Sequence, residues 1–137
     1  QSVIGRNQLL KIESWTKKRA QNAQLLLDYL GDLSILRIPL PNKNFRHAWY
    51  KFHCYLEINA LKTDWNRERI ISEILNLGFP VFSGSCSEIY LEKCFQEIGY
   101  SKMLRLKNAR ELGDTSLMFL VHPTITNEQI KESLEEY

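Results

Sequence analysis

Positions 83–88 contain the residues of this sequence best suited to bind an anionic ligand. They read Ser83, Gly84, Ser85, Cys86, Ser87 and Glu88, between a predicted strand and a predicted helix. A glycine flanked by hydroxyls lets backbone N–H groups approach an anion, and a helix N-terminus favours negative charge. These six residues are therefore candidate substrate contacts. A plain solvated turn explains the same composition, with Ser87 and Glu88 simply capping a helix.

The three cysteines, Cys54, Cys86 and Cys94, form neither a disulfide framework nor a zinc-ligand spacing. We predict no metal site and a reducing, cytoplasmic setting. Cys86 stands at a predicted helix start, where thiol pKa values fall, so one hypothesis is a nucleophile and the other a small buried cysteine. Cys54 lies on the apolar face of a predicted strand and is interpreted as core.

The three histidines are spread along the chain. His47 lies beside Arg46 at the entrance of a predicted strand, where a basic pair can meet a phosphate or simply lie in a solvated loop. We include His47 among the candidate substrate contacts. His53 and His122, on the wetter face of one strand and at the end of another, are interpreted as structural.

The first element expected to position these groups is a long helix. An apolar stripe from Ile4 to Leu30 predicts one helix over residues 2–30, stopped by Gly31. It would be about 43 Å long, whereas a domain of this size has a radius of gyration of about 14 Å. The helix must overhang its own domain or kink. We expect residues 1–31 to connect to a further domain, and residues 32–137 to form the domain proper.

The remaining pattern predicts an α+β domain. Strands are expected at 35–38, at 48–59 with alternating faces, at 79–82 and, as a central apolar strand, at 116–121. Helices are expected after Asn66 up to Gly78, at 89–95, at 106–113 and after a Thr126–Gln129 capping box. We predict a small antiparallel or mixed sheet of three to four strands with helices on one face, preceded in the chain by the long helix.

Composition excludes several classes of protein. The 137 residues carry a net charge of only +2, without a basic stripe, which argues against nucleic acid as a partner. Apolar runs are too short to span a bilayer, and a signal peptide is not visible. Walker, dinucleotide and G-x-S-x-G motifs are also absent from the sequence.

Several segments, in the correct order, resemble the DegT/DnrJ/StrS-type sugar aminotransferases. Residues 1–9 resemble the segment that opens the helix leaving the large domain in that family, and Trp15, Arg19, Asn22 and Ala23 fit the pattern after it. Residues 47–52 resemble a small-domain strand, residues 84–95 a G-S-C-S-E-I-Y block, and residues 110–124 the closing strand. The resemblance covers nearly the whole chain.

The resemblance implies the C-terminal small domain of a type I aminotransferase fold. It implies pyridoxal phosphate as cofactor of the parent protein, a homodimer, and transfer of an amine, usually from glutamate, to a keto sugar carried on a nucleotide for polysaccharide biosynthesis. The Schiff-base lysine and the other cofactor-binding residues lie upstream in that family. We therefore assign neither catalytic nor cofactor-binding residues here, and expect this chain alone to be inactive.

Three hypotheses of function remain open, and one of them is a cysteine-dependent enzyme that uses Cys86 as its nucleophile; the other two concern the domain as a whole. In the first, the chain is a small domain whose 83–88 loop contacts the sugar or nucleotide. In the second, it is a free-standing ligand-binding module that uses the same loop for an anionic ligand. The second reading requires a first helix that packs within its own domain.

Overall fold

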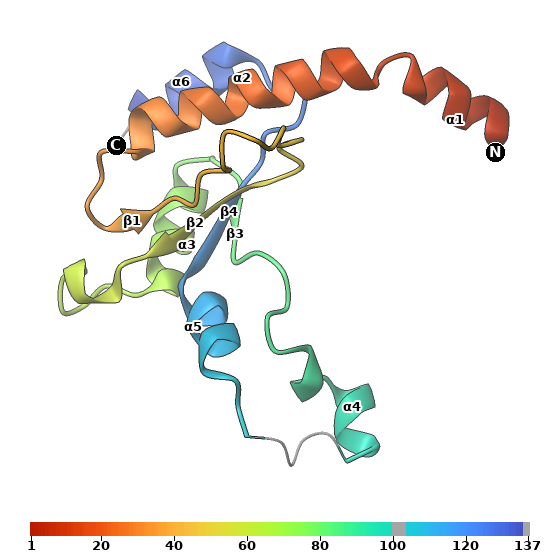
Figure 1. The fold of residues 1–137 in the computed structure, drawn as a ribbon. Coiled ribbons are helices and arrows are strands. Elements are labelled where there is room, and N and C mark those ends of the chain that lie inside the picture. Colours follow the sequence, from red (N-terminus) through yellow and green to blue (C-terminus); the bar gives the residue numbers. More distant parts are fainter. Residues whose placement is uncertain (100–103, 136–137) are drawn as a thin grey trace.

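The structure, a computed structural model, describes residues 1–99 and 104–135. Within these residues four strands form one antiparallel sheet in the order β1-β2-β4-β3 (Figure 1). The strands are β1 (Leu36–Arg37), β2 (Phe52–Leu56), β3 (Val81–Phe82) and β4 (Ser116–Phe119). The predicted α+β class is confirmed, with β4 central and β3 at an edge as expected.

In two places the sequence pattern predicted one helix where the structure has two separate segments. The helices are α1 (Ser2–Leu9), α2 (Ile12–Leu30), α3 (Arg67–Asn76), α4 (Lys93–Glu97), α5 (Lys107–Thr115) and α6 (Asn127–Glu135), with 3-10 turns η1 (Ile58–Ala60) and η2 (Ile89–Leu91). The single helix predicted at 89–95 is wrong, because Glu92 adopts an extended backbone between η2 and α4.

The uninterrupted helix predicted over residues 2–30 is also wrong, because the segment is kinked into the two helices α1 and α2. α1 and α2 meet at Leu10 and Lys11, where the N–H of Lys11 donates to the Gln8 carbonyl at 3.0 Å in a tightened turn. The Ser14 hydroxyl donates to the Lys11 carbonyl at 2.8 Å, just after the break. Hydroxyls that bond to carbonyls of the preceding turn bend helices. This explains the kink without proline or glycine.

The strand predicted over 48–59 is much shorter. Trp49 has a φ of 48°, a left-handed conformation that a strand cannot continue through. Its ring stacks on Phe52, with centroids 5.8 Å apart, so the turn is stabilised by packing. Tyr50 and Ile58, predicted for the buried face, are 75% and 52% exposed.

One face of the sheet is buried under helices. Phe52, Cys54 and Leu56 of β2 alternate with half-buried residues, which confirms the predicted core position of Cys54. Residues from α2, α3, α6 and all four strands complete this apolar cluster, which includes Ala23, Leu26, Leu36, Ile70, Ile74, Val81, Leu117, Phe119 and Ile130. Helices therefore lie mainly on one face, as predicted.

Capping residues fix where the later helices begin and end. Asn66 accepts a hydrogen bond from the N–H of Arg69 at 2.8 Å. Gly78 has a φ of +86°, and the N–H groups of Gly78 and Phe79 donate to carbonyls in the last turn of α3. The capping box of α6 is confirmed, with the N–H of Gln129 donating to Thr126 Oγ1 at 3.2 Å.

A buried amide ties α2 to the turn before α6. Asn22 is 0% exposed, and its Nδ2 donates to the His122 carbonyl at 3.0 Å. Lys18 Nζ adds a 2.6 Å hydrogen bond to Asn127 Oδ1. Helices α2 and α6 consequently run side by side over one end of the sheet (Figure 1).

Beyond β3 the chain leaves the sheet as an arm, which we define as residues 83–99 and 104–115. Figure 1 shows the arm extending away from α1 and α2, on the opposite side of the sheet. It returns through α5, which passes into β4 without an intervening residue. The predicted end of this helix at Gly113 is wrong. A Cβ at Gly113 would meet Ser87 Cβ at 3.1 Å, so glycine is there to let the loop approach the helix.

Among the described residues, none of the helices has the length and apolar character needed to cross a bilayer.

The left-handed Gly78 gives a test of this fold. Gly78→Ala is expected to lower the free energy of unfolding by about 1 kcal/mol, because an L side chain is strained at this φ. Gly5→Ala is the matched control: Gly5 lies inside α1 with no atom of the described residues within 4 Å of a new Cβ. It is expected to be neutral or stabilising by up to about 1 kcal/mol. Equal effects in urea unfolding would contradict the assignment of Gly78.

Candidate functional site

The 83–88 loop begins packed against the open face of the sheet, the face without helices. Ser116 Oγ of β4 donates a short hydrogen bond to the Ser83 carbonyl. Gly84 follows with a φ of +91°, and a Cβ there would lie 3.4 Å from Ser116 Oγ and 3.5 Å from His53 Cε1. Glycine is thus required twice at this position, by conformation and by close approach.

Cys86 is exposed, so the prediction of a buried cysteine is wrong. Its thiol donates to Glu92 Oε1 at 3.2 Å. This hydrogen bond to a carboxylate raises the thiol pKa, with desolvation and the charge of Glu92 adding to it. The nucleophile hypothesis needed the opposite shift. It fails because the predicted helix does not begin at Cys86.

Glu88 is engaged by the arm itself. Its Oε1 accepts hydrogen bonds from Tyr90 Oη at 2.6 Å and Arg105 Nε at 2.9 Å, and Arg105 Nη2 pairs with Oε2. These contacts, Arg105 first and Tyr90 second, lower the carboxyl pKa to about 2. Tyr90 Oη in turn accepts from the N–H of Leu106 at 2.9 Å. Glu88 therefore joins the two sides of the arm.

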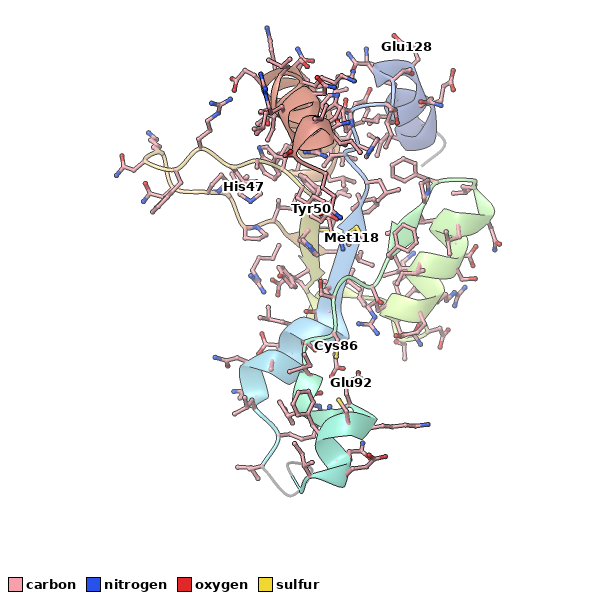
Figure 2. All side chains as sticks on the ribbon, turned by 90° about the vertical axis from the view of Figure 1, so that its right-hand side faces the viewer. His47, Tyr50, Cys86, Glu92, Met118 and Glu128 are labelled. Atoms are coloured by element: carbon pink, nitrogen blue, oxygen red, sulfur yellow. The ribbon has the colours of Figure 1, made fainter. Side chains whose placement is uncertain are left out.

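His47 lies apart from the loop. Figure 2 shows it on the segment before β2, with Tyr50 and Met118 between it and Cys86. Its Nδ1 accepts from the N–H of Trp49 at 3.0 Å, and the two rings stand 4.4 Å apart. Arg46 forms an ion pair with Glu13 of α2. The basic pair suggested by the sequence is thus divided, and the ring of His47 supports the turn at Trp49.

Two residues on the open face lie beside the loop: His53, which the sequence pattern indicated as structural, and Lys51, which was not among the candidates. Lys51 and His53 alternate with buried residues of β2, and both are half-buried. Burial, and then the charge of Lys51, lower the pKa of His53. The only sequence signal was the period-two pattern, which placed His53 on the wetter face. The approach of Gly84 depends on the order of β3 and β4, which the pattern does not contain.

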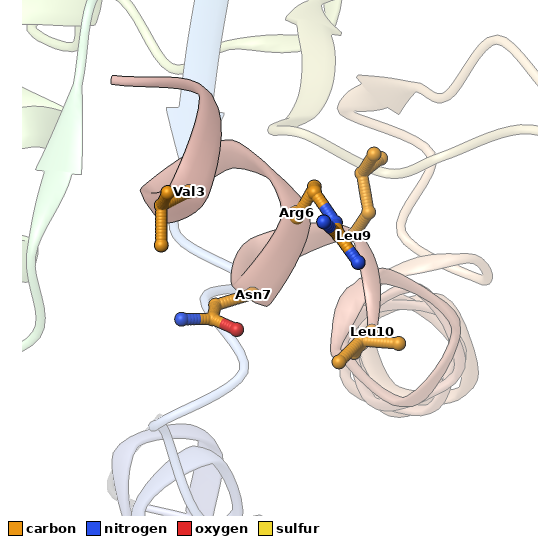
Figure 3. A pocket seen from close by; sticks show the side chains of 5 residues that line it. All are labelled: Val3, Arg6, Asn7, Leu9 and Leu10. Carbon is orange, nitrogen blue, oxygen red and sulfur yellow. The ribbon is translucent and has the colours of Figure 1, made fainter.

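Two apolar surfaces lie apart from the 83–88 loop. A groove of about 840 Å³ lies between the sheet and helices α2, α3 and α6, lined mainly by leucines, isoleucines and phenylalanines. A smaller hollow of about 220 Å³ lies on α1, between Val3, Arg6, Asn7, Leu9 and Leu10 (Figure 3). Neither surface includes a residue of the 83–88 loop.

The described lysines differ from the lysine that pyridoxal phosphate needs. The cofactor is held through a positioned, desolvated lysine amine. All described lysines are exposed or half-buried. Of the two half-buried ones, Lys18 has its amine bound to Asn127, and Lys51 lies in the bend before β2 with its amine over the ring of the exposed Tyr50. These residues do not fit the group, so we derive no catalytic step from them.

Comparisons with known proteins agree on one family. A family model described as the DegT/DnrJ/EryC1/StrS aminotransferase family matches residues 1–136. An uncharacterized protein of Methanocaldococcus jannaschii, MJ1066, is 28% identical over 133 residues, which are 95% of this chain and 33% of that protein.

Solved structures agree in fold. An aminotransferase from Psychrobacter cryohalolentis superposes with a TM-score of 0.92 and 45% identity, covering 98% of this chain and 36% of its own. The GDP-4-keto-6-deoxy-D-mannose-3-dehydratase of E. coli, solved with bound hydrated pyridoxal phosphate, gives 0.76 at 18% identity, covering 96% and 33%. The chain thus spans about a third of the relatives it matches.

The thiol environment makes a kinetic prediction. Cys86 is expected to react with iodoacetamide more slowly at neutral pH than Cys94, because the pKa of the Cys86 thiol is raised and the thiolate is the nucleophile. Glu92→Gln removes the carboxylate and is expected to speed alkylation of Cys86 while leaving Cys94 unchanged. Labelling is followed by mass spectrometry. A Cys86 that reacts faster than Cys94 in the unaltered chain would contradict this.

The Glu88 contacts make a prediction about pH. The folded pKa lies near 2, below the ordinary 4.5, so the stabilisation is present above pH 4.5 and is lost as pH falls toward 2. Glu88→Gln is expected to lower the melting temperature at neutral pH, and the difference from the unaltered chain should shrink across that window. Glu97→Gln, in the same arm, is the control. A difference that is constant with pH would refute the contacts.

Proposed function

Since the chain belongs to the DegT/DnrJ/EryC1/StrS aminotransferase family, we propose that it is the C-terminal small domain of a pyridoxal-phosphate-dependent sugar aminotransferase. Residues 32–137 form this domain, and residues 1–31 connect it to a large domain that supplies the cofactor lysine. The parent protein exchanges an amine for the carbonyl oxygen of a nucleotide-linked keto sugar, with glutamate as the expected amino donor.

The exposed apolar surface of α1 carries the proposal. Val3, Ile4 and Leu9 are 70%, 65% and 66% exposed, and Leu10 at the kink is 84% exposed. Residues 1–14 are all exposed, and α1 contacts α2 alone among the elements with substantial contacts. Apolar surface of this kind marks an interaction site. A neighbouring large domain is the partner that the family suggests.

The loop is assigned to the substrate side. Active sites in this fold lie between domains and between the two subunits of a dimer, so we place Ser83, Gly84, Ser85, Cys86 and Ser87 facing the sugar or nucleotide. Glu88, already bound by Arg105 and Tyr90, holds the loop in shape. His47 is kept as an outer contact through its exposed ring. The cytoplasm is the proposed location, in keeping with three free thiols.

The alternative of a free-standing anion-binding module requires a first helix that packs within its own domain. The exposure of α1 argues against it. The apolar residues of this helix would have to lie in water or in self-association.

The test compares two proteins. The full-length product is expected to take up pyridoxal phosphate, with the long-wavelength absorbance of the lysine-bound cofactor, and to transfer an amine from glutamate to a nucleotide-linked keto sugar. Residues 1–137 alone are expected to show neither, since the lysines at positions 1–99 and 104–135 are exposed or half-buried.

Scattering adds a second readout. The isolated chain is expected to associate through α1 or to show it protruding, whereas the full-length protein should be a compact dimer. A full-length protein without a lysine able to bind the cofactor would refute the proposal. A compact monomer of residues 1–137 with α1 folded onto it would favour the free-standing module instead.

A further inference from the structure

The open face of the sheet carries positive charge next to the 83–88 loop. His53 and Tyr55 lie on this face of β2, opposite Met118 and Ser116 of β4 in the strand register. Lys51 lies in the bend that directly precedes β2, and its charge acts on the ring of His53. Lys51 Nζ lies 5.8 Å from the ring of Tyr50. Within residues 1–99 and 104–135, no carboxylate forms an ion pair with Lys51.

The carboxylates of this region are already engaged. Glu57, at the end of β2, pairs with Arg37 at 3.6 Å. In the arm, Glu88 is bound by Arg105 and Tyr90, and Glu92 accepts from the Cys86 thiol. The ammonium of Lys51 therefore remains available for an anion from outside these residues.

The histidine supplies a donor rather than a second full charge. Its ring lies against Gly84, which is close enough that a Cβ would touch it. Because burial and the neighbouring ammonium disfavour the charged ring, His53 offers one ring N–H. A cation and a neutral N–H donor beside a serine-rich turn are the groups that bind a phosphate oxygen.

We propose that Lys51 and His53 hold a phosphate of the nucleotide-linked substrate, next to Gly84 at the start of the loop. The identity of the sugar nucleotide rests on the function proposed above. Lys51 and His53 are half-buried at the surface of the sheet face opposite helices α2, α3 and α6, a position that suits an extended nucleotide better than a small amino donor. A carboxylate donor is more often gripped by a bidentate arginine, and Arg37 is already paired with Glu57.

The test uses the full-length protein with Lys51→Gln, and Lys51→Arg as the variant that retains the charge. Lys51→Gln is expected to raise the KM for the nucleotide sugar roughly tenfold, the cost of one charge-assisted contact. The half-reaction with glutamate should be unchanged, and Lys51→Arg should recover most of the affinity. Lys62→Gln is the matched control, because Lys62 lines the apolar groove on the helical side.

Direct binding separates this site from the proposed function. Calorimetry with UDP, dTDP and GDP is expected to detect binding of at least one of them, weakened roughly tenfold by Lys51→Gln and also by His53→Leu. If the full-length protein transfers no amine but Lys51→Gln still weakens nucleotide binding, the aminotransferase function fails and the phosphate site stands.

Three results would overturn the site. One is unchanged nucleotide affinity in Lys51→Gln and His53→Leu. Another is an equal loss in the glutamate half-reaction, which would place the contact on the donor or the cofactor. The third is failure of all three nucleotides to bind the unaltered protein. Circular dichroism confirms that each variant is folded, and His53→Leu decides the matter if Lys51→Gln does not fold.

Discussion

The antiparallel pairing of β2 with β4 is the constraint on which the rest of this domain depends. It joins two segments far apart in the sequence, with Phe52 opposite Phe119 and Cys54 opposite Leu117. That register brings the apolar residues of both strands to one face, where α2, α3 and α6 cover them. By the same alternation it brings His53 to the other face, and Lys51 lies next to it in the bend before β2. The core and the candidate phosphate site are therefore two sides of one register.

The charged side chains around the loop differ in whether another side chain already pairs with them. Glu88, a candidate substrate contact from the sequence, binds Arg105 and Tyr90, and Glu92 accepts from the Cys86 thiol. Their negative charge is thus largely used within the arm. Lys51 lacks such a partner among the described residues and retains its attraction for an anion. The half-buried cation at the start of β2 is a stronger binding candidate than the exposed hydroxyls of the 83–88 loop.

Local patterns predicted what local interactions decide. The capping residues Asn66 and Thr126, the buried position of Cys54 and the central apolar strand follow from spacing alone, and the structure confirms them. The pattern failed where packing overrides it. Trp49 turns left-handed because its ring stacks on Phe52, and α5 continues past Gly113 to Thr115. The approach of Gly84 to His53 requires β3 beside β4, a tertiary arrangement that no local spacing contains.

The two ends of the arm are connected to the sheet in different ways. On the return side, α5 passes straight into the central strand, so a backbone hydrogen-bonded as helix continues as backbone hydrogen-bonded as sheet. On the outgoing side, the chain leaves an edge strand through a glycine with a φ of +91°. The outgoing side is therefore held to the sheet by side chains, through the hydrogen bond from Ser116 to the Ser83 carbonyl and the approach of Gly84 to His53. One connection of the arm to the sheet is continuous backbone, and the other depends on the residues that face the candidate phosphate site.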